Sequence, residues 1–392
     1  MDFETVGVEE EFLLVDPASR LPVPLSVEVL DTALAGGVPT GASFQPELVR
    51  TQVETATGVC GDMSTVAEHL RALRGTLGAA ARTHDARLVS VGNPVLSGGP
   101  PPLTPGERFD RIHRQYAEIV DSYQACGCHV HVGLPDRETA VAVLNHLRPW
   151  LPTLLALSAN SALTDGRDTG YASWRMVTQA RFPGAGIPPY FPSVTAYDRE
   201  VARLVDCGVL VDADMTFWLA RPSPRYATLE VRAADTAGTV DDALLQAALT
   251  RALVRTARAD LAAGRDAPEV HEQVAAAAMW SAARHGLDGP AVDPLLGKQV
   301  PAKDLLHQML VRVRPALEET GDLPLVRRQV HRVLTAGTSA ARQRATYAQA
   351  REWRAVVDML VAQTAQTTQT IHTARTAETG ALPAPFVADA LG

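Results

Sequence analysis

Residues 5–15, TVGVEEEFLLV, set the first expectation for the fold. The segment is apolar except for Glu9, Glu10 and Glu11, and its pattern predicts a β-strand that ends at the turn residues Asp16-Pro17. Strand side chains alternate between faces, so Glu9 and Glu11 share one face and Glu10 lies on the other. Burying two unpaired carboxylates on one face is costly. We therefore expect a divalent cation or an arginine beside them, with a solvated edge strand as the alternative.

Composition limits the classes of protein that this chain can form. It has 392 residues, 46% of them hydrophobic, with a net charge of −8, which predicts folded domains rather than disorder. The pI of 5.8 disfavours nucleic-acid binding. No apolar run is long enough for a membrane span, and the acidic start lacks the basic region of a secretory signal. Four cysteines are too few for a disulfide framework, so we expect a cytoplasmic protein.

The remaining pattern predicts a strand-rich region followed by a helical one. Strands are expected at 88–91, 125–133 and 228–233, and helices at 62–82 and from Asp136, with kinks at Pro149 and Pro152. Residues 92–106 and 181–193 are loops rich in proline and glycine. No flexible linker interrupts the chain, so we expect one integrated catalytic domain over 1–392. It would comprise a strand-bearing core at 1–239, a helical region at 240–375 and a flexible tail at 376–392.

Residues 126–131, CGCHVH, contain two cysteines and two histidines that suggest zinc. Alternation argues against it, because Cys126 and Cys128 share one strand face while His129 and His131 share the other. We therefore expect the cysteines to be small buried side chains and the histidines to face a polar group. A pair of hydrogen-bonded core histidines is the plainer alternative.

Residues 221–232, RPSPRYATLEVR, bring three arginines close to a glutamate. Arg221 and Arg225 precede the expected strand, and guanidinium groups suit phosphate oxyanions. Glu230 and Arg232 lie on the same strand face, where they could also simply form an ion pair.

The absence of common motifs limits the classes of active site that the chain can contain. The sequence has no phosphate-binding loop of the P-loop type, no Gly-rich dinucleotide fingerprint and no nucleophile elbow. Two further carboxylates, Glu47 and Glu54, lie seven residues apart in ELVRTQVET. Carboxylate and imidazole ligands without thiolates favour Mg²⁺ or Mn²⁺. Several carboxylates and arginines together suggest a nucleotide that is held through metal ions.

The chain resembles the carboxylate–amine ligases of the glutamate–cysteine ligase type 2 family. The resemblance rests on strings such as GVEEEFLLVDP, ELVRTQVETATGVC, CGCHVHVGLPDRETAVAVLNHLRPW and RPSPRYATLEVRAADT, and it spans about residues 6–345. It implies the α+β catalytic fold of glutamine synthetase, in which a curved, mainly antiparallel sheet carries helices on its outer side. The active site of that fold lies on the concave face.

The resemblance also implies roles for individual residues. The implied metal ligands are Glu9, Glu11, Glu47, Glu54, His129 and Glu230. Arg221 and Arg225 would face the nucleotide phosphates, and Arg232 would hold the acid substrate, so these three arginines are the expected catalytic residues. The implied substrate pocket also includes Trp174, Arg175, Arg181 and His131.

These roles predict an ATP- and Mg²⁺-dependent ligase that joins a glutamate-like acid to an amine through an acyl phosphate. Weak synthesis of γ-glutamylcysteine would fit the family. The alternatives are a phosphotransferase acting on a guanidino group with the same fold, and a non-catalytic protein that binds Mg²⁺ and nucleotide. The expected partners are small molecules, without nucleic acid or membrane, and the resemblance suggests a homodimer.

Overall fold

A computed structural model of the protein describes residues 4–365, in which a seven-stranded antiparallel sheet is the central element. The strand order is β2-β3-β1-β5-β9-β8, and β4 pairs with β1 outside this path. The strands are β1 (Val6–Val15), β2 (Ser43–Pro46), β3 (Gln52–Ala56), β4 (Arg87–Val89), β5 (Gly127–Gly133), β8 (Ala220–Pro222) and β9 (Thr228–Asp235). The predicted α+β class with an antiparallel sheet is confirmed.

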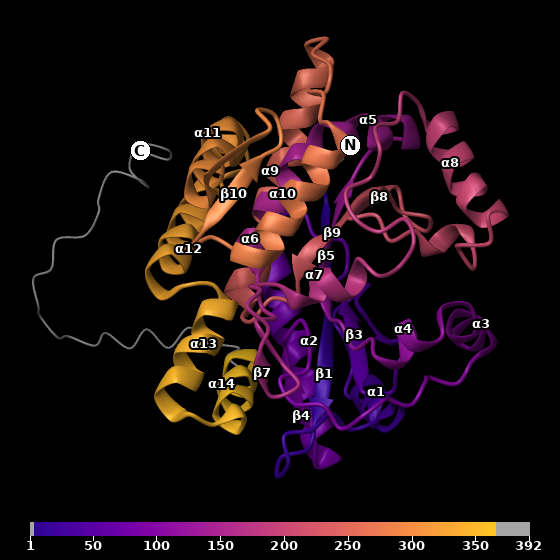
Figure 1. Ribbon diagram of the computed structural model, residues 1–392, viewed down its shortest axis with the longest axis vertical. Coiled ribbons are helices and arrows are strands. Elements are labelled where there is room, and N and C mark those ends of the chain that lie inside the picture. Colours follow the sequence, from indigo (N-terminus) through magenta and orange to yellow (C-terminus); the bar gives the residue numbers. More distant parts are fainter. Residues whose placement is uncertain (1–3, 366–392) are drawn as a thin grey trace, which may run out of the picture.

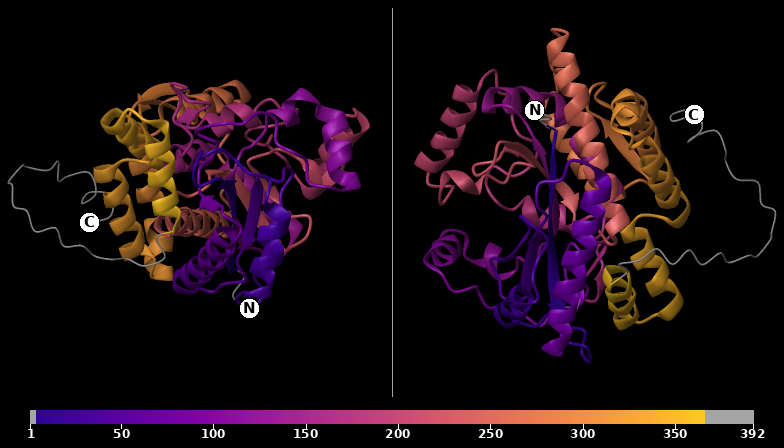
Figure 2. Two further views of the ribbon diagram at one scale, coloured as in Figure 1. Left: turned by 90° about the horizontal axis from the view of Figure 1, so that it is seen from below. Right: turned by 180° about the vertical axis from the view of Figure 1, so that it is seen from behind.

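Helices lie on both sides of the sheet (Figure 1). The first half contains α1 (Ser26–Ala35), α2 (Met63–Thr83), α3 (Glu107–Tyr116), α4 (Glu118–Asp121), α5 (Arg137–Leu147), α6 (Leu151–Ser158), α7 (Trp174–Gln179) and α8 (Val194–Asp206). The second half contains α9 (Val240–Ala262), α10 (Glu272–His285), α11 (Ala302–Thr320), α12 (Leu323–Ala336), α13 (Ser339–Ala350) and α14 (Trp353–Ala365). Helices α9 to α14 lie to one side of β1, and α3, α4 and α8 lie to the other (Figures 1 and 2).

Short-range signals explain where several of these helices begin. The Asp62 side chain accepts a hydrogen bond from the backbone N–H of Thr65 at 2.8 Å, and Asp136 caps α5 in the same way through Thr139 at 2.7 Å. Thr239 and Asp242 form a reciprocal capping box at the start of α9. The proline-rich segment after α5 is a short 3₁₀ turn, Arg148–Trp150, which confirms a break at the predicted kink.

The main apolar core lies on the sheet face opposite Glu9 and Glu11. Its members come from β1, β5 and β9 and from α2, α5, α6, α9 and α11. Glu10 points to this covered face, as predicted, and its carboxylate pairs with Arg74 of α2 at 2.5 Å with both side chains fully buried. Arg74 also donates to the carbonyl oxygen of Ala237 at 2.7 Å. The pair therefore fastens the middle of β1 to the helix layer.

Replacing Arg74 with methionine should destabilise the protein strongly, because it leaves the Glu10 carboxylate buried without a partner. Removing one partner of a buried ion pair costs about 3–5 kcal/mol. The matched control is Arg203→Met, which breaks an exposed pair with Glu200 on α8 and should cost less than about 1 kcal/mol. Urea unfolding of both variants measures the difference, and equal losses would contradict this view of the pair.

Several elements of the structure were not expected from the sequence. The helical region contains a β-hairpin of β10 (Pro290–Asp293) and β11 (Lys298–Pro301), and a second small hairpin joins β6 (Leu163–Thr164) to β7 (Arg167–Asp168). Arg221, which was expected only to precede the strand at 228–233, lies in a strand of its own, the edge strand β8. The predicted tail at 376–392 lies outside the described residues. Between residues 4 and 365, no helix is long and apolar enough to cross a membrane.

Candidate active site

The sheet face that carries Glu9 and Glu11 contributes to a cavity of about 290 Å³ that is lined mainly by polar side chains. Strand alternation explains its composition, because two residues of each central strand, spaced two apart, line it: Glu9 and Glu11 of β1, His129 and His131 of β5, and Glu230 and Arg232 of β9. Of the residues predicted from the sequence, the cavity wall contains Glu9, Glu11, Glu47, Glu54, His129, His131, Arg221, Arg225, Glu230 and Arg232. Segments that are far apart in the sequence thus meet at one site.

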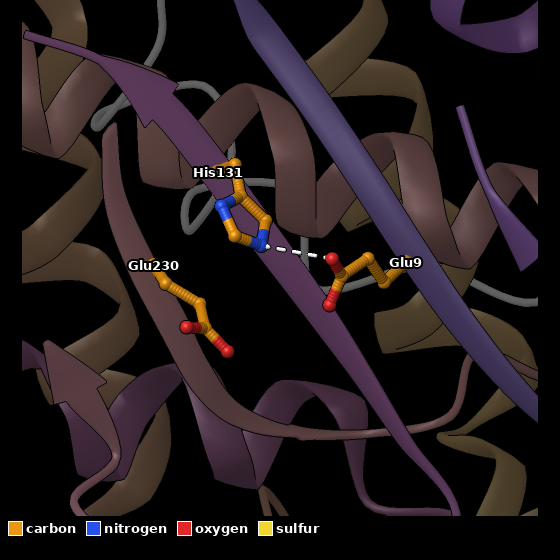
Figure 3. Close-up of side chains that lie close together, drawn as sticks. All are labelled: Glu9, His131 and Glu230. Atoms are coloured by element: carbon orange, nitrogen blue, oxygen red, sulfur yellow. Dashed lines mark ion pairs between the residues drawn. The ribbon is translucent and has the colours of Figure 1, made fainter. Parts of the chain in front are cut away.

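Glu9, His131 and Glu230 form the first of two clusters in this cavity (Figure 3). They come from the neighbouring strands β1, β5 and β9, and one ligand atom of each lies within 4.8 Å of the others. The His131 Nε2 atom is 3.2 Å from a Glu9 oxygen, and its Nδ1 atom is 2.9 Å from the Thr228 hydroxyl. Two carboxylates and one imidazole on a rigid sheet can bind a divalent cation.

Glu11, Glu47 and Glu54 form the second cluster, again with ligand oxygens within 4.8 Å of one another. Glu11 and Glu54 are directly paired across β1 and β3, while Glu47 follows β2. Burial and mutual repulsion raise the pKa of Glu54 well above its ordinary value, and burial and Glu47 raise the pKa of Glu11. Repulsion among these three carboxylates opposes their ionisation, and a divalent cation bound between them would relieve it. Carboxylate oxygens are also the ligands that such cations prefer.

His129 lies between the two clusters. Its Nδ1 atom is 3.3 Å from Glu9 and 3.9 Å from Glu230, and its Nε2 atom is 3.7 Å from Glu11. Burial, together with the charge of Arg232, lowers the pKa of His129. A neutral imidazole in this position can serve as a metal ligand. The structure therefore places both histidines beside the acidic groups, and it brings His131 as close to Glu9 as His129.

The arginines of the cavity differ in their partners. Arg221 donates to Glu230 at 2.8 Å, and Arg232 pairs with the same carboxylate from within β9. Burial opposes ionisation of Glu230, but these two guanidinium groups hold its pKa well below the usual value. The ion pair that the sequence left open is thus present. Arg225 is exposed at the rim, where no ion pair to another described side chain occupies it.

Arg175 lies behind the cavity rather than in its wall. It is 2% exposed, donates to the Arg232 carbonyl oxygen at 3.2 Å, and lies 3.8 Å from Asp235. Gly127 leaves room for this side chain, because a Cβ atom there would lie 2.5 Å from an Arg175 terminal nitrogen and something would have to shift. Arg175 is close enough to lower the pKa of Glu11 by its charge, against the larger effect of burial.

Trp174 and Arg181 are not brought to the cavity. Trp174 packs edge-on against Tyr171 with ring centroids 5.5 Å apart, and Arg181 donates to the Ser122 hydroxyl at 2.8 Å. Their assignment to substrate binding stays a prediction that no contact supports. The cavity instead contains residues that the sequence did not suggest, among them Arg108, Tyr123 and Phe217. No sequence motif marks these residues. Arg108 lies on α3, Tyr123 follows α4, and Phe217 precedes β8.

The thiols do not take part in either cluster. Cys126 and Cys128 are buried, and the Cys126 sulfur accepts a hydrogen bond from Gln52 at 3.0 Å. Burial raises the pKa of both thiols well above the ordinary value, which disfavours the thiolate that zinc requires. The interpretation of these residues as small buried side chains fits their placement.

Curated relatives match almost the whole chain. A protein of Saccharopolyspora erythraea, provisionally named as glutamate–cysteine ligase 2-2, is 54% identical over 363 residues and is matched over 92% of each chain. A provisionally named glutamate–cysteine ligase 2-1 of Nocardia farcinica is 46% identical over 364 residues, which are 93% of this chain and 94% of the relative.

Solved structures share the fold at low sequence identity. The glutamate–cysteine ligase of Francisella tularensis, solved in complex with AMP, has a TM-score of 0.66 at 15% identity and covers 99% of this chain and 92% of its own. A bifunctional glutathione synthetase of Pasteurella multocida has a TM-score of 0.67 at 13% identity over 93% of this chain and 53% of its own. The sequence profile of glutamate-cysteine ligase family 2 matches residues 5–363. The chain therefore belongs to glutamate-cysteine ligase family 2.

Proposed function

We propose that the protein is an ATP-dependent carboxylate–amine ligase that forms an amide through an acyl phosphate. The observation that supports this most is the arrangement of two clusters that could hold a cation, and of three arginines, in one cavity. Family membership and the provisional names of the relatives give the same reaction class. We further propose Mg²⁺ as the cation, glutamate as the acid and cysteine as the first candidate amine. Mn²⁺ is the alternative cation.

The position of each residue in the cavity suggests which part of the substrates it would bind. The first cluster with His129, and the second cluster, would each hold a cation, and such cations neutralise phosphate charge during phosphoryl transfer. Arg221 and the exposed Arg225 would bind the transferred phosphoryl group. Arg232, deeper on β9, would orient the carboxylate of the acid substrate. Arg232 lines the cavity, so its guanidinium group could reach that carboxylate.

The proposed reaction has two steps, and each step forms one bond and breaks another. A carboxylate oxygen of the acid attacks the γ-phosphorus of ATP, and the bond from that phosphorus to the β-phosphate bridging oxygen breaks, which releases ADP. The amine nitrogen then attacks the acyl carbon, loses a proton and expels phosphate. The polar side chains of the cavity would hold ATP and the acid substrate next to each other. The arginines of the cavity would stabilise the negative charge on the transferred phosphoryl group.

Cation binding should strengthen with rising pH, because the second cluster must lose protons first. The pKa values of Glu11, Glu47 and Glu54 are raised, so these groups hold protons above the ordinary carboxyl value of 4.5. Affinity for Mg²⁺ should therefore fall as pH is lowered from neutral toward that value. Calorimetry in two buffers of different ionisation enthalpy should detect proton release, and Glu54→Gln should reduce it. Proton release that is zero in the wild-type protein would contradict the arrangement.

A phosphate-release screen tests the proposed function. The protein receives Mg²⁺, ATP and glutamate, and the amine is varied, with cysteine first. Release that depends on both acid and amine supports the ligase. A phosphorylated guanidino compound in place of an amide would identify the phosphotransferase alternative, and nucleotide binding without turnover of any pair would identify the non-catalytic one.

The cellular location and the oligomeric state remain proposals. The four cysteines are free, and three of them are buried, which fits the reducing cytoplasm that we propose. We also propose small-molecule substrates without nucleic acid or membrane as partners. Sedimentation of the purified protein would test the suggested homodimer.

A further inference from the structure

A second cavity, which we call the rear cavity, is lined by residues other than those of the candidate active site. It has a volume of about 490 Å³, within the range that holds small organic ligands. Its wall is formed by one face of α10, by α7 and by the loop 184–189, and it shares no lining residue with the active-site cavity. In Figure 1, α7 and α10 lie next to each other beside the sheet.

The wall of the rear cavity is mainly apolar. Met176, Ile187, Trp218 and Met279 contribute aliphatic or aromatic surface, and small alanines of α10 leave the space open. Trp280 borders the cavity while its side chain is 55% exposed. A large aromatic residue at the edge of an apolar hollow is typical of a ligand site.

One buried cation gives this cavity a chemical preference. Arg148 lines it and is only 3% exposed, yet it forms no ion pair with any residue between 4 and 365. Its Nε donates to the Pro188 carbonyl oxygen at 2.9 Å, and one terminal nitrogen reaches the Val270 carbonyl oxygen at 3.5 Å. Neutral carbonyl groups compensate a buried charge less well than an anion does. The acidic Glu272 also lines the cavity, but it is exposed on α10.

We propose that the rear cavity binds a small organic carboxylate with an aromatic or branched aliphatic body. The carboxylate would pair with Arg148, and the apolar body would lie against Met176, Met279 and Trp280. The pairing of one buried guanidinium with a mainly apolar hollow selects this class over sugars, free phosphates and nucleotides, which need more polar contacts.

Two segments of the rear cavity also reach toward the active site. Helix α7 turns Met176 to the cavity, while the neighbouring Arg175 points to Gly127 of β5. In the segment before β8, Phe217 lines the active site and Trp218 lines the rear cavity. A ligand in the rear cavity would therefore rest against the same elements that position the reaction site. The binding proposal itself does not depend on the reaction.

Calorimetry with phenylacetate, and with its neutral analogue phenylacetamide, tests the proposal on the full chain. We expect saturable binding with one site per chain and an affinity for phenylacetate about ten-fold or more above that for phenylacetamide. Arg148→Met should reduce this ratio to about one, and Arg148→Lys should retain part of it. Equal affinity of the wild-type protein for both probes would overturn the role of Arg148.

Two neighbouring alanines of α10 offer a matched pair for locating the site. Ala276→Phe fills the rear cavity and should abolish binding of phenylacetate, whereas Ala277→Phe lies outside its wall and should leave the affinity unchanged. Both positions are exposed, so thermal unfolding should be similar for the two variants. Absence of saturable binding at millimolar phenylacetate, or binding that survives Ala276→Phe, would overturn the proposal.

Discussion

Glu230→Gln is expected to lower the rate of Mg²⁺- and ATP-dependent phosphate release on the order of a hundred-fold or more. Glu230 is one of the three residues of the first cluster, and it also holds Arg221 and Arg232. Glutamine keeps the shape of the side chain but removes its charge. The cation site is thus weakened, and the two arginines lose the anion that orients them.

The control for this variant is Glu118→Gln on α4, an exposed glutamate that does not line the cavity. It should retain activity within about two-fold, as is usual for surface substitutions. Both proteins should be folded, which circular dichroism and unfolding curves establish. Full ligation by a folded Glu230→Gln protein would contradict the assignment of Glu230 to the metal and arginine network.

Arg232→Lys should lower kcat/KM for the acid substrate by roughly ten- to a hundred-fold, even though the charge is retained. The Arg232 guanidinium pairs with Glu230 and lies 3.5 Å from the Nδ1 atom of His129. A lysine ammonium can replace one of these contacts but cannot also present a flat pair of donors to a carboxylate. We expect the larger part of the loss in KM for the acid.

Arg203→Lys on α8 is the matched exchange for Arg232→Lys. Arg203 is exposed and pairs with Glu200 on the same helix, so its replacement should leave both kcat and KM unchanged. Steady-state kinetics with the acid varied at saturating ATP separates the two outcomes. An Arg232→Lys enzyme with the wild-type KM would mean that Arg232 does not hold the acid.

The long strands and their faces could be predicted from the sequence because their pattern is local. Alternation alone placed Glu9 opposite Glu10 in β1 and separated His131 from Cys128 in β5, and the structure confirms both. Likewise, the caps at Asp62 and Asp136 are short-range signals, and these helices begin one residue later.

Other features depend on contacts across the chain that no local pattern contains. The partner of Glu10 is 64 residues away in sequence, so its ion pair with Arg74 could not be deduced. Strand β8 was missed because Pro222 within it and Pro224 after it resemble a loop, although pairing with β9 makes β8 extended. Tyr123 follows a short helix without any motif, and only the packing of α4 brings it to the cavity.

The division of roles among the proposed metal ligands also needed three-dimensional information. The resemblance assigned His129 to the metal and His131 to the substrate, whereas the structure groups His131 with Glu9 and Glu230. Residues 129 and 131 share one strand face, so alternation cannot distinguish them. Only the register of β5 between β1 and β9 determines which carboxylates each imidazole meets.

Transfer of an oxygen isotope tests the central claim most directly. Glutamate labelled with ¹⁸O in its side-chain carboxylate is incubated with the protein, Mg²⁺, ATP and an amine that supports turnover, and the released phosphate is analysed by mass spectrometry. The acyl-phosphate route predicts one ¹⁸O atom in each phosphate formed, because the attacking carboxylate oxygen leaves with phosphorus. Phosphate that forms together with the amide but contains no label would contradict the proposed mechanism.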